Sequence, residues 1–425
     1  MQALTKKIGF LAAIATPILC FYAILAHYLI DIPLGDDYET VLPFMARIAP
    51  MDWLHRLGYV FQFQHNEYKL IFENAVFAVQ YAVLERPDFI ILCLVGNLLV
   101  LVLFLGIWRY LMAKIDLDQK LMTAVPIAFV LFELRYAETL NCSMAALQNI
   151  SVLVFSLFCI ACLTRSRDWI ACLLFALSIA SSGNGFILLP IGIWLMASRR
   201  AWPQLAAWIA VFATMAAVYF VHYVPYSPNN SPVTLTRMIQ HLNPIYTLSY
   251  MGSLIGLQWA ISASVGAALL FVFVLMIRKR YDRVNATVFY FAIFLIITAV
   301  AVGGIRSDLG LYQSFTGRYR IYSVLLMVCS YIFAMETSKR WFRPALVTAI
   351  LLCIMGDVYG HFYYKRQTRE MLEEAVIYSQ GLCGNDALCN RRYQGLVEAR
   401  NIYRLPSIDL HSVAGGAASN AAVNR

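Results

Sequence analysis

Residues 8–30 read IGFLAAIATPILCFYAILAHYLI, an almost unbroken apolar run that decides the kind of fold to expect. A helix needs about 20 apolar residues to cross the hydrocarbon core of a bilayer. Lys6 and Lys7 precede the run, as they would in a secretory signal peptide. However, the run is longer than the roughly 7–15 residues of a signal peptide's apolar region, and no small-residue cleavage site follows it. We therefore expect it to remain as an uncleaved membrane anchor.

The composition of the whole chain agrees with a lipid environment. Of the 425 residues, 61% are hydrophobic and only 13% are charged, and the mean hydropathy is +0.66. Soluble domains carry about 25% charged residues. The formal net charge of +9 does not indicate a nucleic-acid partner, because Lys and Arg occur in short clusters between apolar segments. We expect an all-α polytopic membrane domain over residues 1–362 and a short tail over residues 363–425.

Further apolar runs follow the first, each long enough to span a membrane or slightly shorter. Together the expected spans lie at about 8–30, 88–111, 121–137, 145–164, 168–182, 185–198, 203–224, 254–277, 285–304, 319–336 and 343–362. The sequence thus predicts about eleven transmembrane helices.

Positive charge gives these helices an orientation, because Lys and Arg concentrate in the short cytoplasmic loops of membrane proteins. If the N-terminus is cytoplasmic, every strongly basic short loop lies on the same side. These loops contain Arg109, Lys114, Lys120, Arg165, Arg167, Arg199, Arg200, Arg278, Lys279, Arg280, Arg283, Lys339, Arg340 and Arg343. Segments 31–87, 225–247 and 305–318, the turn around 181–184 and the C-terminal tail then face outward.

The sequence does not decide directly whether residues 70–84 cross the membrane. This run is apolar enough to span, and a crossing there would invert the orientation of every later loop. Glu73, Asn74 and Gln80 interrupt the run, and inversion would break the charge pattern. We therefore favour a helix that lies in the membrane interface over one that spans the membrane.

The C-terminal tail gives an independent indication of this orientation. Cys383 and Cys389 flank a short polar loop. They could form a disulfide only in an oxidising compartment, as an outward-facing tail would provide. Two free thiols are the alternative.

An acidic motif, Asp36-Asp37-Tyr38-Glu39, lies near the start of the first external segment. One interpretation is structural, with Asp36 or Asp37 capping a following helix over 39–48. The other is a carboxylate held at the membrane surface as a general base, which removes a proton from a sugar hydroxyl as that hydroxyl attacks an activated sugar. A phosphate leaving group departs as an anion, so such a base needs nearby cations and no general acid.

The same segment continues with Gln64-His65-Asn66-Glu67-Tyr68-Lys69, a polar run without apolar periodicity. It fits either a polar rim above an interfacial helix or a pocket for sugar hydroxyls or phosphate. In the second case Lys69 is a point charge and His65 an additional acid–base group. No metal-ligand spacing appears in the chain, and the sequence leaves the participation of a divalent cation undecided.

Gly317-Arg318-Tyr319-Arg320 places two guanidinium groups on the outer side of a span, against the usual charge bias. We expect them to meet an anion such as phosphate. The alternative is an ion pair with Glu133, Glu138 or Asp308. Two weaker signals are the turn over 181–185 and the charged stretch 133–138, where pairing alone is a sufficient explanation.

These motifs and their places in the chain resemble those of the GT-C superfamily of membrane glycosyltransferases. Asp36-Asp37-Tyr38-Glu39 is similar to the family's catalytic Asp-Asp, Asp-Glu or Asp-Tyr-Glu motif, which also follows the first span. The polar run over 64–69 is similar to a His-Asn-Glu stretch in bacterial members. The segment 318–320 looks like a Ser-Arg-Tyr segment, although Gly317 replaces the serine here.

The resemblance implies a GT-C-like helical bundle with interfacial helices in the first external loop. It also implies an inverting transfer from a polyprenyl-phosphate sugar to a lipid-linked glycan or other cell-envelope acceptor, on the periplasmic face of a bacterial inner membrane. In this family assignment Asp37 is the base, with Asp36 as the alternative. Lys69, Arg318 and Arg320 stabilise phosphate charge, and His65, Asn66, Glu67 and Tyr319 complete the substrate site.

Other function classes remain as alternatives. A transporter or lipid-glycan flippase is the first, although no charged relay near span centres and no paired broken helices are evident. A polysaccharide polymerase or ligase would concentrate its polar residues in a large late loop, whereas this chain has them in the first. A purely structural membrane protein is the last.

Overall fold

The computed structural model describes residues 2–224, 235–256, 258–337 and 342–406, and its secondary structure is almost entirely α-helix. Part of the expected external stretch, 225–234, lies outside these residues, as do the basic residues Lys339 and Arg340 and the end of the tail.

Within this part of the chain, seven segments are long and apolar enough to cross a membrane. They are formed by α1 (Gln2–Tyr28), α5 (Phe89–Gly106) with the π-helical turn η2 (Ile107–Leu111), α8 (Ser143–Leu163), α11 (Trp202–Phe220), α14 (Trp259–Arg278), α15 (Ala286–Arg306) and α16 (Gly317–Thr337). Each lies at a predicted span. The chain therefore has the helices of a multi-pass membrane protein.

The other four predicted spans also coincide with helices. These are α6 (Leu117–Leu131), α9 (Asp168–Ser181), α10 (Leu188–Ser198) and α17 (Phe342–Gln380). By length, α6, α9 and α10 fall short of the roughly 20 residues that a perpendicular span requires. Helix α17 runs without a break through the expected domain boundary at 362, so the expected tail begins inside a helix.

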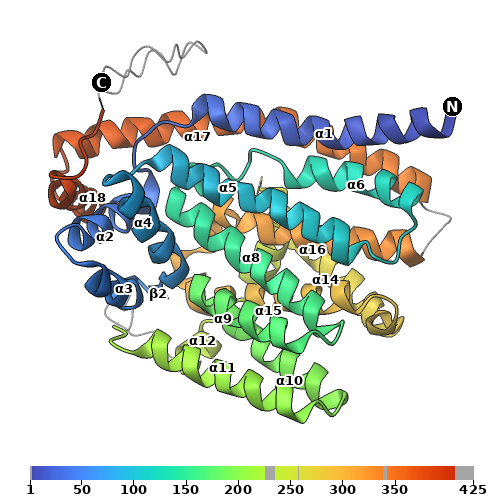
Figure 1. Cartoon of the computed structure of the whole chain (residues 1–425). Helices are drawn as coiled ribbons and strands as arrows, with labels where there is room; N and C mark the ends of the chain where they lie inside the picture. The colour runs from blue at the N-terminus through green and yellow to red at the C-terminus, as the bar shows by residue number, and fades with distance from the viewer. Residues whose placement is uncertain (1, 225–234, 257, 338–341, 407–425) are drawn as a thin grey trace.

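The long helices lie side by side, with α1 and α17 along one side of the bundle and α10 and α11 along the opposite side (Figure 1). Helices α5 and α8 pack closely. A Cβ atom on Gly96 of α5 would lie 2.7 Å from the Cβ of Ala146 on α8, which is closer than real side chains pack. Glycine at this position lets the two backbones meet in the middle of the apolar core.

The first loop folds into a small lobe at one end of the bundle (Figure 1). It consists of η1 (Gly35–Tyr38), α2 (Val41–Ile48), α3 (Trp53–Gln62), β1 (Gln64–His65), β2 (Tyr68–Lys69) and α4 (Ile71–Leu84). The two short antiparallel strands pair Gln64 with Lys69 and His65 with Tyr68, a departure from the purely helical fold that we expected. Short helices complete the chain: α7 (Ala137–Leu140), η3 (Gly183–Ile187), α12 (Leu235–Gln240), α13 (Pro244–Met251), η5 (Tyr281–Arg283), η6 (Ser307–Leu309) and η7 (Leu311–Phe315).

This lobe has an apolar core of its own, to which the C-terminal segment contributes. Tyr38, Phe44 and Phe77 from the first loop are buried together with Leu372 of α17. The final helix, α18 (Ala387–Ala399), packs on α2 and η1. Residues far apart in the sequence thus build one lobe.

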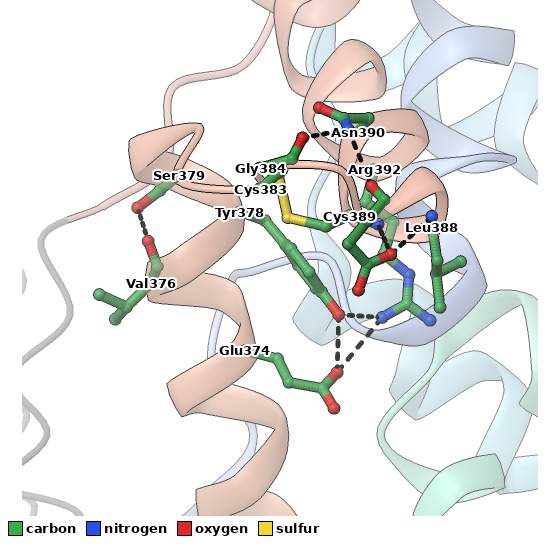
Figure 2. Close-up of a disulfide and its surroundings, with 11 residues drawn as sticks. Glu374, Val376, Tyr378, Ser379, Cys383, Gly384, Leu388, Cys389, Asn390 and Arg392 are labelled. Carbon is green, nitrogen blue, oxygen red and sulfur yellow. Dashed lines mark hydrogen bonds and ion pairs between the residues drawn. A yellow bond between two sulfur atoms is a disulfide. The ribbon is translucent and has the colours of Figure 1, made fainter.

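A disulfide between Cys383 and Cys389 joins the turn after α17 to the first turn of α18 (Figure 2). Asp386 caps α18 by accepting hydrogen bonds from the backbone N–H groups of Leu388 and Cys389 at 2.8 and 3.1 Å. Arg392 of α18 donates to the hydroxyl of Tyr378 on α17 at 2.6 Å. These contacts hold α18 against the end of α17.

Removing the disulfide should loosen α18. Cross-links that close short loops stabilise by about 2 kcal/mol, so Cys383→Ser should raise the rate of amide hydrogen exchange over residues 387–399. Hydrogen-exchange mass spectrometry of the purified protein checks this. Cys20→Ser, which changes an exposed free cysteine of α1, is the control. Equal exchange of α18 in both variants would show that the disulfide does not hold the helix.

Candidate functional site

A cavity of about 150 Å³ lies between the small lobe and the adjoining ends of α8, α15 and α16. Most of the residues that line it are polar or charged, and they come from four separate parts of the chain. The lining residues are Asp36, His65, Asn66, Glu67, Tyr68, Met144, Gln148, Asn149, Ile305, Arg306, Asp308, Leu309, Arg318 and Tyr319. The structure thus brings together six of the residues that the sequence singled out, namely Asp36, His65, Asn66, Glu67, Arg318 and Tyr319.

Asp36 and Arg318, which both line the cavity, form an ion pair. The Arg318 Nη1 atom donates to Asp36 Oδ2 at 2.6 Å, and both side chains keep partial contact with solvent. Burial alone would raise the pKa of the Asp36 carboxyl, but the charge and hydrogen bond of Arg318 outweigh it and hold this pKa well below its usual range. Asp36 is therefore an ionised carboxylate facing the cavity. The ion-pair partner of Arg318 is thus Asp36 and none of Glu133, Glu138 and Asp308, which the sequence offered as the alternative to an anion contact.

The hairpin over 64–69 contributes four residues to the cavity lining: His65, Asn66, Glu67 and Tyr68. Asn66 opens the two-residue turn with a φ of 49°, a backbone conformation that asparagine tolerates better than most residues. Its amide lies 2.9 Å from Nε2 of His65. Burial lowers the pKa of His65 despite the nearby carboxylates of Asp36, Glu39 and Glu67, so the imidazole is neutral at neutral pH.

Arg306 is a cavity residue that sequence reasoning missed. From the end of α15 it pairs with the Glu67 carboxylate and donates to the Tyr68 hydroxyl at 3.0 Å. A signal was available, because Arg306 lies on the expected outer side of a span, against the charge bias that drew attention to Arg318. The cavity thus contains two arginines, each paired with a carboxylate from the first loop.

Asp37 is not among the residues that line this cavity and is completely buried. Its carboxylate accepts hydrogen bonds from the Ser143 and Met144 backbone N–H groups at 3.1 and 2.9 Å, from the Ser143 hydroxyl at 2.8 Å and from the Leu34 N–H at 3.3 Å. Ser143 and Met144 are the first residues of α8, so Asp37 caps that helix from a distance. The helix that we expected Asp36 or Asp37 to cap begins instead at Val41 with Thr40 as its N-cap residue.

Lys69 and Arg320, which we expected to contact phosphate, lie outside the cavity lining. Lys69 is fully buried, and its ammonium donates to the backbone carbonyl of Gln62 at 3.0 Å. Arg320 donates to the backbone carbonyl of Arg135 at 2.7 Å and holds a neighbouring loop through the Ser253 carbonyl at 3.3 Å. Neither residue is among those that line the cavity. Both side chains therefore stabilise the packing of backbone segments through hydrogen bonds to carbonyl groups.

A smaller hollow of about 20 Å³ adjoins the cavity and shares Tyr68, Gln148, Asn149 and Tyr319 with it. The turn over 181–185, a weak signal in the sequence, contributes Ser182 and Asn184 to this hollow. In the charged stretch 133–138, Arg135 pairs with Glu133. Among the described residues, no group of three His, Cys, Asp or Glu side chains is arranged to hold a metal ion.

No family model, curated protein or solved structure matches this chain. The resemblance to membrane glycosyltransferases therefore depends on the sequence motifs alone.

The buried carboxyl of Asp37 should make stability depend on pH in a definite direction. Burial, only partly offset by its hydrogen bonds, raises the pKa of Asp37 to about 6. The folded protein then holds this proton more tightly than the unfolded chain, whose aspartates titrate near about 4. The stabilisation is fully present below about pH 4 and is lost as the pH rises through about 6.

Thermal midpoints of wild type and Asp37→Asn in detergent, measured from pH 4 to pH 7, check this assignment. The wild-type midpoint should fall more than that of the variant across this interval. At pH 4, where both side chains are neutral, the variant should be less stable by about 1–3 kcal/mol, because an amide nitrogen replaces one oxygen that accepts from backbone N–H groups. Parallel curves of equal height would contradict the capping role.

Proposed function

We propose that the protein is an inverting membrane glycosyltransferase. It moves a sugar from a polyprenyl-phosphate donor to a lipid-linked glycan or another cell-envelope acceptor, on the periplasmic face of a bacterial inner membrane. The observation that supports this most is a cavity lined by the Asp36 carboxylate and by two arginines at the ends of apolar helices. This combination offers a base for an attacking hydroxyl and cations for a departing phosphate.

Asp36, in preference to Asp37, is the general base of this proposal. A base must come within hydrogen-bond reach of the hydroxyl that it deprotonates. Asp36 lines the cavity, whereas Asp37 is buried and its oxygens are occupied by the first turn of α8. In this proposal Asp36 has the catalytic role and Asp37 the structural one.

Arg318 links donor binding to the strength of this base. While Arg318 is paired with Asp36, the pKa of Asp36 stays low and the carboxylate is a weak base. A donor phosphate that enters the cavity competes for the same guanidinium, and phosphate suits the planar donors of arginine. Transfer of Arg318 to the phosphate frees Asp36 and raises its pKa toward the usual range.

The transfer is a single displacement at the anomeric carbon. The acceptor oxygen forms a bond to the anomeric carbon from the face opposite the phosphate, and its proton passes to Asp36. The bond between the anomeric carbon and the phosphate oxygen breaks, and polyprenyl phosphate leaves with the bonding electrons. Arg318 and Arg306 stabilise the charge that develops on the phosphate.

The size of the cavity agrees with a small reacting group. Pockets for drug-sized ligands measure about 300–1,000 Å³, whereas this one measures about 150 Å³. It suits a single sugar ring or a phosphate. The lipid chain of the donor would remain among the membrane helices.

The eleven-span topology belongs to this proposal. In it α6, α9, α10 and α17 cross together with the seven longer segments, while α4 lies at the membrane interface. The N-terminus is then cytoplasmic, and the small lobe with α18 is periplasmic. Burial of Glu73, Asn74 and Gln80 on α4 supports an interfacial helix, because these polar groups face the protein.

Substitution of Asp36 tests the chemistry. General-base catalysis contributes about 10²–10⁴-fold, so Asp36→Asn should lower transfer by that factor with little change in thermal stability. Arg318→Ala should weaken donor binding and turnover together, because the phosphate loses a cation in both the ground state and the transition state. The assay incubates purified protein with a panel of polyprenyl-phosphate sugars and a lipid-glycan extract, and follows the release of polyprenyl phosphate.

Asp118→Asn is the matched control. Asp118 pairs with Lys7 at 3.3 Å on the surface and is not a cavity residue. Its replacement should leave transfer unchanged. Normal transfer by a well-inserted Asp36→Asn protein would exclude Asp36 as the base. If wild type released no polyprenyl phosphate from any donor but moved lipid-linked glycan across vesicle membranes, the protein would be a flippase.

Labelling of single cysteines tests the topology. In a chain whose exposed Cys20 is replaced by serine, a membrane-impermeant maleimide added from the periplasm should label His55→Cys and Val397→Cys. It should not label Arg167→Cys or Lys279→Cys until the membrane is opened. All four wild-type residues are exposed. Opposite sidedness for positions 55 and 397 would contradict the eleven-span arrangement.

A further inference from the structure

A second hollow, separate from the cavity, runs between the small lobe and α18. It measures about 410 Å³, and α2, the residues around β1 and α18 form its walls. Its polar lining includes Glu39, Arg47, Gln64, Arg391, Gln394 and Glu398. We call this hollow the tail groove, because α18 supplies one whole wall.

The charges of the tail groove cancel across it. Arg391 of α18 donates to Glu39 at 3.0 Å, and Arg47 of α2 pairs with Glu398 of α18 at 3.4 Å. Each arginine is thus neutralised by a carboxylate on the opposite wall. Each charge of the groove thus already has a partner, and the donor and acceptor positions that remain suit an uncharged ligand with many hydroxyl groups.

Hydrogen-bonding groups remain for such a ligand. The side chain of Gln394 is exposed, and no hydrogen bond joins it to another residue of the described chain. Asn390 uses its amide N–H group on the Gly384 and Asp386 carbonyls, which leaves its amide oxygen facing outward. The ion-paired carboxylates and guanidiniums also retain further acceptor and donor positions.

The wall made by α18 has a fixed position. A Cβ atom on Gly395 would lie 1.9 Å from the backbone carbonyl oxygen of Tyr38, so only glycine allows this approach. Tyr38 directly follows Asp37, and the helix therefore rests on the acidic segment itself. Together with the disulfide at Cys389, this contact makes the tail groove a rigid hollow.

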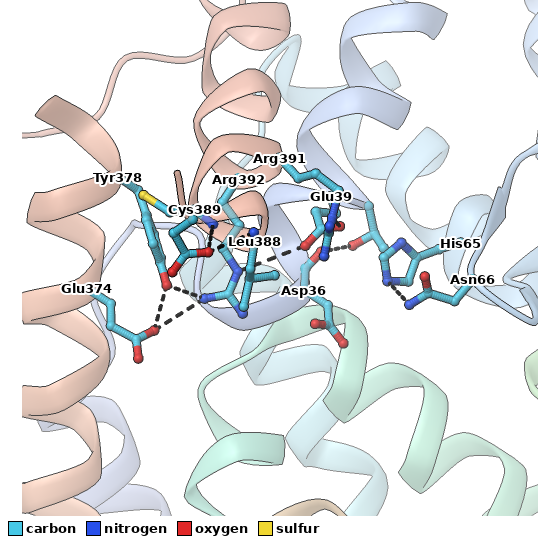
Figure 3. Close-up of polar contacts among 12 residues, drawn as sticks. Asp36, Glu39, His65, Asn66, Glu374, Tyr378, Leu388, Cys389, Arg391 and Arg392 are labelled. Atoms are coloured by element: carbon cyan, nitrogen blue, oxygen red, sulfur yellow. Dashed lines mark hydrogen bonds and ion pairs between the residues drawn. The ribbon is translucent and has the colours of Figure 1, made fainter. Parts of the chain in front are cut away.

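The tail groove and the cavity share the segments that carry the chemistry. Glu39 of the groove donates its backbone N–H to the carbonyl of Asp36 at 3.0 Å, within one turn. Gln64 of the groove precedes His65 of the cavity. Figure 3 shows Asp36 and Glu39 on the same turn, with Arg391 and Arg392 on the facing helix.

We propose that the tail groove binds an uncharged oligosaccharide, which is the glycan portion of the acceptor. The oligosaccharide lies in the groove while its terminal hydroxyl reaches Asp36 in the cavity. This inference depends on the proposed transferase function. The position of the groove supports it, because Glu39 of the groove and Asp36 of the cavity lie on the same turn.

Saturation-transfer NMR on the full-length protein in detergent tests this binding directly. The probes are uncharged trisaccharides of glucose, galactose, mannose, rhamnose and N-acetylglucosamine, with a sialylated trisaccharide and a tripeptide for comparison. Wild type should bind at least one uncharged trisaccharide. Gln394→Leu and Glu398→Ala should each weaken this binding by about threefold to tenfold, as expected for one lost hydrogen bond.

Gln380→Leu, a change of an exposed residue at the end of α17 outside the groove, is the matched control and should bind as wild type does. Asp36→Asn should also bind normally, which separates acceptor binding from chemistry. The proposal is overturned if no uncharged trisaccharide binds, if only the charged probe or the peptide binds, or if both groove variants bind as the control does. Trisaccharide binding in the groove by a wild type that releases no polyprenyl phosphate would count against the transferase function alone.

Discussion

The carboxylate of Asp37, buried against the N-terminus of α8, is the constraint on which the rest of the site depends. The first turn of a helix carries unpaired N–H groups and a partial positive charge. In α8 that turn is met by an acid more than a hundred residues earlier in the chain. Ionisation of a buried carboxylate is costly, and four donors offset part of that cost. The first loop is thereby fixed to the helical bundle.

Fixing Asp37 also places its neighbour. The 3-10 turn over Gly35–Tyr38 directs Asp36 into the cavity while Asp37 enters the protein. The arginines that meet the first loop come from α15 and α16, so the cavity depends on contacts between the loop and three helices of the bundle. On the other side of the same turn, α18 packs against Tyr38 and supplies the tail groove. One short segment therefore organises both hollows.

The sequence predicted the helices well because apolar runs of about 20 residues have few alternatives in a membrane. It also directed attention to the acidic motif, to the hairpin and to Arg318. It could not distinguish Asp36 from Asp37, because adjacent acids look alike until the partners of each carboxylate are known. Lys69 and Arg320 were expected to bind phosphate, but their donors meet backbone carbonyls, and such contacts between distant segments leave no local pattern. Arg306 carried the same topological signal as Arg318 and was overlooked.

In the proposed function, the cavity holds a polyprenyl phosphate with Arg318 as its cation and Asp36 beside it. A cryo-electron microscopy structure of the protein with polyprenyl phosphate bound would test this most directly. We expect phosphate density within hydrogen-bond distance of the Arg318 guanidinium, with the ion pair between Arg318 and Asp36 broken. Phosphate density outside the cavity, with that ion pair intact, would contradict this proposal.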